Sequence, residues 1–236
     1  MRLGRSHGEQ QHPADDPADE TVTSELGWVS IDADRRRWIL CPLAFPAGCD
    51  RDSWAAEAAA AWLERWGLPA DTPEAESLAA MLRLIHERAN VQIKCHQIWI
   101  YLPDRFTTPL PVFLAVWRQS GDRYRRLRML TEADKRLRML TEADNKSGAR
   151  EPQTDEVTTE HLGTGLQVLH QRTQGNGELL AFLAYAFRVE EHATDLQLFT
   201  LTSDLRALMA ASDDIGRLVQ GITVYRNTDE RLVVEA

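Results

Sequence analysis

Apolar positions in the second half of the chain follow first the period of strands and then that of a helix. Three apolar runs predict strands: Leu166–Arg172, Leu179–Val189 and Leu196–Thr202. The Gln-Gly-Asn-Gly cluster at 174–177 predicts a tight hairpin between the first two. Helical spacing follows, starting at Ser203-Asp204 and stopping at Gly221. Antiparallel strands that lead into one packed helix predict an α+β fold.

The first half of the chain shows two short strand-like runs and then a helical run. Trp28–Asp32 and Arg37–Leu43 predict strands on either side of a charged turn. Asp50 or Asp52 can cap a helix that runs to Trp66, because aspartate accepts hydrogen bonds from the free backbone N–H groups at a helix start. A stripe with four-residue spacing predicts the packing face of this helix: Trp54, Ala58, Trp62 and Trp66.

A second helix is predicted from Thr72 onward, after Gly67 and Pro69 have ended the first. Thr72 is a suitable N-cap, and Pro73 follows in the first helical position. The apolar stripe of this helix predicts which side chains are buried: Leu78, Met81, Leu82, Ile85 and Ala89, with His86 at the border.

Cys95–Leu102 and Leu110–Arg118 are strand-like runs with mostly apolar side chains on both faces. Such a hairpin belongs in the centre of a sheet that is covered on both sides. Trp99, Tyr101 and Trp117 are the candidate ligand-binding residues if a cavity lies beside this hairpin. They are core residues if helices cover it, and this second interpretation is favoured.

The segment Arg126–Asp134 recurs without a change at Arg136–Asp144. One continuous helix over both copies keeps the leucines within an arc of about 140°, which is workable as an apolar stripe. The alternative is a second copy that is extended or looped out at the surface. One identical pair is a local duplication, because a repeat solenoid needs three or more stacked units.

The remaining segments suggest one domain with a tail. Residues 1–22 are polar and acidic and predict a disordered tail. Residues 23–236 are expected to form a single α+β domain that contains the duplicated decapeptide at 126–144. A stretch near residues 145–156 is rich in turn-forming residues and predicts a surface loop.

Charge and cysteine content narrow the class of protein. The formal net charge of −9 disfavours a nucleic-acid partner, because contacts with phosphates require a positive surface. No apolar stretch reaches the roughly 20 residues of a membrane span, and the N-terminus lacks the apolar segment of a secretory signal. Cys41, Cys49 and Cys95 suit free thiols in a reducing compartment. We therefore expect a cytoplasmic protein with no membrane partner.

The chain carries no recognisable catalytic motif: it has no P-loop, dinucleotide-binding glycine pattern, nucleophile elbow or zincin pair. Cys95 and His96 point to opposite faces of a strand and cannot form a dyad, whereas Cys95 could still meet His170 in three dimensions. A buried structural cysteine is the simpler interpretation. Cys41 and Cys49 are too far apart for a compact metal knuckle. We predict no catalytic residue, no metal site and no cofactor.

Clusters of charged residues are interpreted as solvated surface groups. The arginines 35–37 have Asp32 and Asp34 beside them, which balance their charge. Acidic residues likewise interleave with the arginines of the duplicated segment, so these need no phosphate ligand. The same interpretation applies to three acidic clusters: Glu160-His161, Glu190–Asp195 and the pair Asp213-Asp214, which is expected on an exposed helix face.

The order of predicted elements resembles the PsbP-like sandwich, in which helices cover both faces of a central antiparallel sheet. The resemblance includes the closing helix Ser203–Val219 followed by Ile222–Tyr225. Some segments are also similar to actinobacterial proteins of uncharacterised function: Cys41–Gly48, Leu102–Asp104, Leu162–Leu166 and Tyr185–Val189. The alternative architecture is a helix-grip fold, with one curved sheet around a long C-terminal helix.

Each architecture implies a function. Members of the PsbP-like class are mostly accessory or binding proteins. This resemblance therefore implies a bacterial binding or accessory protein that acts through a protein partner, and it favours a role other than catalysis. The helix-grip fold implies a carrier of an apolar small molecule, or an enzyme, with its pocket between sheet and helices.

Overall fold

The computed structural model describes residues 29–92, 95–105, 107–119, 121–131, 151–173 and 177–225, with the side chains of 89–92 excepted. The elements in chain order are β1 (Val29–Ile31), β2 (Trp38–Cys41), α1 (Arg51–Glu64), α2 (Pro73–Gln92), β3 (Gln97–Tyr101), β4 (Leu110–Arg118), α3 (Arg123–Thr131), β5 (Gln153–Thr159), β6 (Gly163–Thr173), β7 (Leu179–Val189), a 3-10 turn (Glu190–His192), β8 (Thr194–Thr202), α5 (Leu205–Gln220) and β9 (Ile222–Val224). No described helix has the length and apolar character that crossing a membrane requires.

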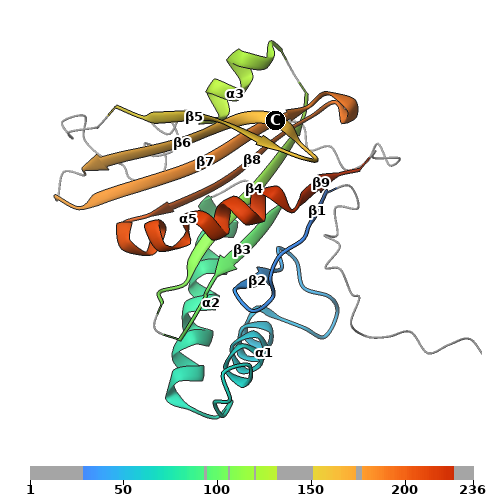
Figure 1. The fold of residues 1–236 in the computed structure, drawn as a ribbon. Helices are drawn as coiled ribbons and strands as arrows, with labels where there is room; N and C mark the ends of the chain where they lie inside the picture. The colour runs from blue at the N-terminus through green and yellow to red at the C-terminus, as the bar shows by residue number, and fades with distance from the viewer. Residues whose placement is uncertain are drawn as a thin grey trace, which may run out of the picture.

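The strands form a seven-stranded sheet and a separate two-stranded one (Figure 1). The large sheet has the order β2-β3-β4-β8-β7-β6-β5, and every neighbouring pair is antiparallel. The small sheet pairs β1 with β9, also antiparallel. The predicted α+β class with a mostly antiparallel sheet is confirmed.

Helices cover both faces of the large sheet. On one face, α5 packs on alternate side chains of the central strands, such as Leu183, Leu198 and Leu114, together with β1 and β9. On the other face, α1 and α2 pack on Ile98 and Phe182. The helix α3 lies on this second face, further along β6 and β7 (Figure 1). Because both faces are covered, β3 is buried along its whole length and β7 over ten of its eleven residues.

The helix boundaries follow local capping chemistry, as the sequence predicts. At the start of α1 the Asp50 carboxylate accepts from the backbone N–H of Ser53 at 2.7 Å, and Ser53 reciprocates. At α2 the Thr72 hydroxyl accepts from the backbone N–H of Ala75 at 3.3 Å. At α5 Asp204 caps the first turn and Gly221 ends the helix. The stop at Gly221 also serves packing, because a Cβ there would overlap the carbonyl oxygen of Asp32.

The two strands predicted on either side of the charged turn both form, in different sheets: Val29 of β1 pairs with Val224, whereas Trp38 of β2 pairs with Tyr101. Other expectations about the elements are corrected. On α2, Met81 is exposed rather than buried. The loop expected near 145–156 is wrong from Gln153 onward, where strand β5 begins. The sequence did not predict this strand, because its residues are mostly polar and exposed.

The duplicated segment is described only as far as Thr131, where α3 ends. The first copy is therefore helical from Arg126 to Thr131, as predicted. The remainder of the predicted helix, including the second copy, lies outside the described residues. So do the tail expected at 1–22, the hairpin turn at 174–176 and the first part of the loop, 145–150.

Candidate functional site

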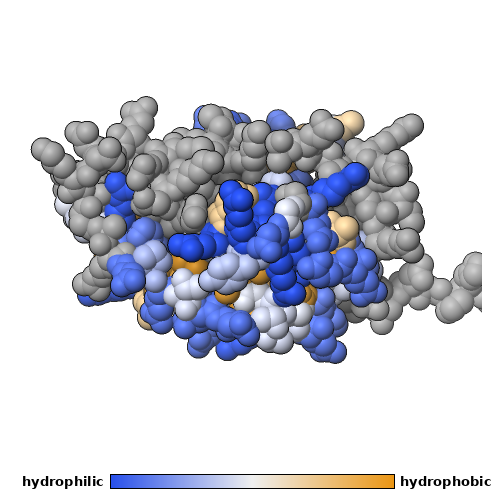
Figure 2. Space-filling model, turned by 90° about the horizontal axis from the view of Figure 1, so that it is seen from above, coloured by the Kyte–Doolittle hydropathy of each residue, from blue (hydrophilic) through white to orange (hydrophobic). Residues whose placement is uncertain are grey.

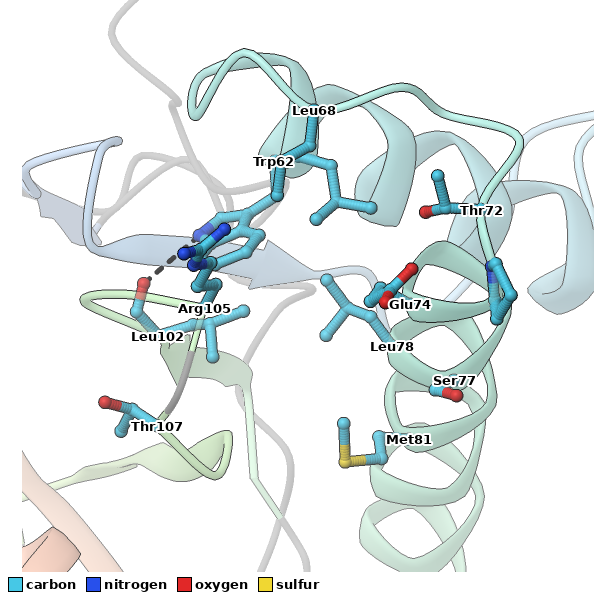
Figure 3. A pocket seen from close by; sticks show the side chains of 12 residues that line it. Trp62, Leu68, Thr72, Glu74, Ser77, Leu78, Met81, Leu102, Arg105 and Thr107 are labelled. Carbon is cyan, nitrogen blue, oxygen red and sulfur yellow. Dashed lines mark hydrogen bonds between the residues drawn. The ribbon is translucent and has the colours of Figure 1, made fainter.

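A pocket of about 540 Å³ lies where the end of α1, the start of α2 and the connection between β3 and β4 meet (Figure 3). Trp62 and Leu63 come from α1, and Leu68 from the turn that follows it. Leu78 and Met81 extend from α2 toward the same space. The apolar lining thus comes from separate segments, and tertiary packing brings it together.

The polar groups in the wall of this pocket are mostly engaged within the protein. The indole N–H of Trp62 donates to the carbonyl oxygen of Leu102 at 3.1 Å. The hydroxyl of Thr72 caps α2, and that of Thr107 donates to the Asp104 carboxylate at 2.8 Å. An occupant therefore meets a wall in which the polar groups of Trp62, Thr72 and Thr107 already have partners, which favours apolar side chains or an apolar ligand beside them.

Apolar side chains continue from the pocket onto the surface. Met81 is 40% exposed, and Leu84, one turn further along α2, is 45% exposed. Trp66 is 47% exposed and its ring lies 5.9 Å from that of Trp62 in the pocket wall. We call Trp66, Met81 and Leu84 the pocket rim. Large exposed apolar groups around a pocket are typical of a binding surface.

Two charged residues from different elements, Glu74 and Arg105, also line the pocket (Figure 3). Glu74 lies in the first turn of α2, and Arg105 belongs to the loop after β3. Both residues are exposed. They can therefore give polar contacts to an occupant whose apolar part enters the pocket.

A second cluster of polar groups surrounds Asp214, in the middle of α5. The Asp214 carboxylate accepts from the hydroxyl of Tyr101 at 2.5 Å and from the guanidinium of Arg37 at 2.6 Å. Arg217 adds an ion pair one turn further along α5. Burial, followed by the charge and hydrogen bond of Asp214, raises the pKa of Tyr101 to about 12. This cluster fastens α5 to β2 and β3, and the exposed position expected for Asp214 is wrong.

A third cluster surrounds Asp195, at the start of β8. Asp195 is fully buried, and Arg188 contacts it through two nitrogens at 2.6 and 3.0 Å. Arg126 of α3 reaches the same carboxylate at 3.2 Å and lies over the ring of Trp117 at 5.4 Å. The expectation that the acidic residues at 190–195 are solvated is therefore wrong for Asp195. Its role in the structure is to join α3 to the sheet.

The other side of α3 fits the expectation of a solvated arginine face. Arg123, Arg125 and Arg128 are exposed. Seen from above, the described part of this face is mostly hydrophilic, with only small hydrophobic areas (Figure 2). The face therefore differs in character from the apolar pocket rim.

The three candidate ligand-binding aromatic residues do not form one site. Trp99 and Tyr101 lie in the core beneath α5, and the indole N–H of Trp99 donates to the Gln97 side chain at 2.9 Å. Trp117 lies on the opposite face of the sheet, beside α3. None of the three lines the pocket between α1, α2 and the loop after β3.

The candidate thiol and imidazole groups are also separated. Cys95 precedes β3, and His170 lies on β6, four strand positions away in the sheet, which corresponds to about 19 Å. His96 accepts a hydrogen bond from the backbone N–H of Val116 at 3.0 Å. Burial raises the pKa of Cys41 to about 12. Within the described part of the chain, no group of three acidic, histidine or cysteine residues could hold a metal ion.

His86 on α2 is a buried residue, packed between Phe45 at 5.0 Å and Trp54 at 6.3 Å, measured between ring centroids. Burial lowers the pKa of His86. The histidine expected at the border of the apolar stripe is thus part of an aromatic cluster between α1, α2 and the segment before α1.

No protein-family model and no curated protein matches the sequence. Among solved structures, the chain is similar to the cyanobacterial PsbP protein CyanoP from Synechocystis sp. PCC 6803, with a TM-score of 0.40 and 9% identity over 84% of this chain and 93% of that one. It is also similar to the Ran-binding protein Mog1p from Saccharomyces cerevisiae, with a TM-score of 0.34 and 11% identity over 62% of this chain and 87% of that one. Both TM-scores lie below 0.5, and neither likeness carries a function over to this chain.

Sequence reasoning missed this pocket, although two signals for it were present. Trp66 stands at the end of the tryptophan stripe, next to Gly67, where a helix ends and side chains become exposed. Met81 lies on the flank of the α2 stripe rather than at its centre, which Leu78 and Leu82 occupy. Both positions are therefore candidates for an exposed apolar edge.

Proposed function

We propose that this protein is a binding or accessory protein that acts through a protein partner, and that the pocket between α1 and α2 receives apolar side chains of that partner. The observation that carries the proposal is the pocket rim. Trp66, Met81 and Leu84 present large apolar side chains to solvent beside the pocket. Tryptophan and methionine are enriched at protein interfaces, where they supply much of the binding energy.

The geometry defines the kind of segment that fits. One or two large apolar side chains would enter the pocket, and flanking apolar groups would cover the rim. Polar groups of the partner could then reach the exposed Glu74 and Arg105 side chains in the pocket lining. A bacterial origin and a cytoplasmic location belong to the same proposal. Cys41, Cys49 and Cys95 are not joined in disulfides, which is compatible with that location.

The volume of the pocket also supports a second candidate function, the binding of an apolar small molecule. A pocket of about 540 Å³ lies within the usual range for small-molecule sites, roughly 300–1,000 Å³. A small molecule held inside the pocket would leave the apolar rim exposed. A protein partner covers both, and for this reason we place it first.

Selection from a random-peptide library on the immobilised full chain tests the proposal. We expect the selected peptides to share a large apolar anchor residue. Met81→Arg places a charge in the pocket wall and should weaken their binding at least tenfold. Met209→Arg is the matched control, because Met209 is an exposed methionine on α5, away from the pocket. Its effect should be negligible.

Two results would contradict the proposal. Peptides that bind the Met81→Arg variant as tightly as the parent would use another surface. Failure to select any peptide, combined with Met81-dependent binding of an apolar fluorescent dye, would favour the small-molecule carrier instead.

A further inference from the structure

The helix α3 is held on the sheet mainly by residues of the duplicated segment, Arg126–Asp134. Leu127 and Leu130 are buried in a cluster with Ala186 of β7, and Leu166 of β6 packs against this cluster. Thr131 is also buried, and its hydroxyl donates to the backbone carbonyl of Leu127 at 3.1 Å. The apolar face of α3 therefore lies within the first copy of the repeat.

The polar contacts of the same helix also come from the first copy. Arg126 donates from Nε to the buried Asp195 carboxylate at 3.2 Å, and its guanidinium lies 5.4 Å from the centre of the Trp117 ring. The side-chain amide of Gln197 donates to the backbone carbonyl of Leu130. We define the α3 site as the surface that receives these groups: Trp117, Leu166, Ala186, Asp195 and Gln197.

The first-copy side chains that contact the α3 site, and the buried Thr131 beside them, recur ten residues later in the same order. Arg136, Leu137, Leu140 and Thr141 stand in the second copy where Arg126, Leu127, Leu130 and Thr131 stand in the first. We propose that the α3 site is a binding site for a helical segment of the type Arg-Leu-x-x-Leu-Thr, and that either copy of the repeat can occupy it. The chain then exchanges between two registers that differ by ten residues.

Contacts upstream of the repeat favour the first copy. Asp122 accepts from the backbone N–H of Arg125 at 2.9 Å, and Arg123 donates to the carbonyl oxygen of Thr164 at 2.7 Å. Asp122 and Arg123 are not part of the repeat: ten positions later the chain has Glu132 and Ala133 in their place. The register with the first copy in the site is thus the major one, and the second copy replaces it when the first is impaired.

The connection to β5 is long enough for the shifted register. Eleven residues separate Thr141 from Gln153, and such a segment can extend over about 40 Å. The strand β6, on which α3 lies, has eleven residues and is about 36 Å long. With the second copy in the site, the chain can therefore still reach the start of β5.

The test is the melting temperature of the full chain with Leu127→Asp, with Leu137→Asp and with both substitutions. Aspartate in the buried leucine position prevents that copy from occupying the site. We expect Leu137→Asp to melt within about 1 °C of the parent and Leu127→Asp to lose less than half of what the double variant loses. If Leu127→Asp alone melts as low as the double variant, only the first copy can bind and the proposal is wrong.

A chain lacking residues 136–145 provides the matched control, because it has only one copy. In this single-copy chain Leu127→Asp should lower the melting temperature as much as the double variant does in the full chain. A milder pair, Arg126→Ala with and without Arg136→Ala, should show the same pattern without a charge in the core. If Leu137→Asp destabilises the full chain as much as Leu127→Asp, both copies are packed at once, and exchange is excluded.

Discussion

Two buried carboxylates, Asp195 and Asp214, show how far a single residue can be interpreted from its neighbours in the sequence. Asp213 and Asp214 look alike in the sequence, yet Asp213 is exposed and Asp214 is buried. The helical period distinguishes them, because Asp214 falls on the side of Ala211 and Leu218. Its partners could not be predicted, since Tyr101 and Arg37 are 113 and 177 residues away.

This contrast predicts the effect of neutralising each acid. Asp214→Asn removes the negative charge that faces Tyr101 and Arg37 and should lower the free energy of unfolding by about 1–3 kcal/mol. Arg37 stays 45% exposed at its side chain and can turn to water, which limits the loss. Asp213→Asn, the matched control, should change the free energy by less than about 0.5 kcal/mol. Denaturant melts of both variants measure the difference, and equal effects would contradict this account of Asp214.

The phenol groups of Tyr101 and Tyr185 make stability depend on alkaline pH. Burial raises the pKa of both to about 12, from an ordinary value of 10. The folded state then holds protons that the unfolded state loses above pH 10, so stability should fall as the pH rises from about 10 to about 12. Denaturant melts across this range check the trend. Tyr101→Phe should make the fall shallower, and a slope that is unchanged in this variant would argue against the assignment of Tyr101.

At the scale of elements, sequence periodicity predicted the helix starts and most of the strands, which local chemistry decides. The helices α1, α2 and α5 begin at the predicted caps, and β3, β4 and β7 lie in the predicted apolar runs, whereas β6 and β8 start a few residues earlier than predicted. Sequence periodicity could not predict which strands pair, because β1 pairs with β9 through residues almost two hundred positions apart. The strand β5 was not predicted, because it lies at the edge of the sheet and its residues are mostly polar, so it shows no alternation of apolar and polar positions.

Two glycines of the same region should respond to alanine with opposite signs. Gly221→Ala places a Cβ against the carbonyl oxygen of Asp32 and should destabilise the protein by more than about 1 kcal/mol, since backbone must move. Gly216→Ala, inside α5, meets only the Tyr185 hydroxyl at 3.9 Å. It should stabilise by up to about 1 kcal/mol, because alanine loses less conformational entropy in a helix. Thermal melts of the pair check the prediction, and a stable Gly221→Ala variant would contradict the close packing of β1 on this turn.

The central hairpin allows a test of the closed core beneath α5. Trp99 is buried among apolar neighbours, and Trp99→Ala should lower the free energy of unfolding by about 3–5 kcal/mol. Trp66→Ala, at an exposed tryptophan, should cost less than about 1 kcal/mol. Denaturant melts compare the two. A small loss for Trp99→Ala would mean that space around it is already empty, as a ligand cavity beside the hairpin requires.

At the scale of the whole molecule, the arrangement of layers places a pocket beside exposed apolar side chains. The faces of the sheet are used for packing, so the pocket forms where α1, α2 and the loop after β3 meet (Figures 1 and 3). Its lining comes from three stretches between Trp62 and Thr107. The sequence shows which of these residues are apolar, but only the fold brings them to one place.

The central claim is that this pocket and its rim form the binding surface, and the five methionines of the chain allow it to be tested without a mutation. The most direct test is methyl NMR of the full chain with labelled methionine. Spectra are recorded while a selected peptide is added. We expect the Met81 methyl signal to shift in proportion to binding while that of Met209 on α5 stays in place. A peptide that binds and leaves the Met81 signal unchanged would contradict the account.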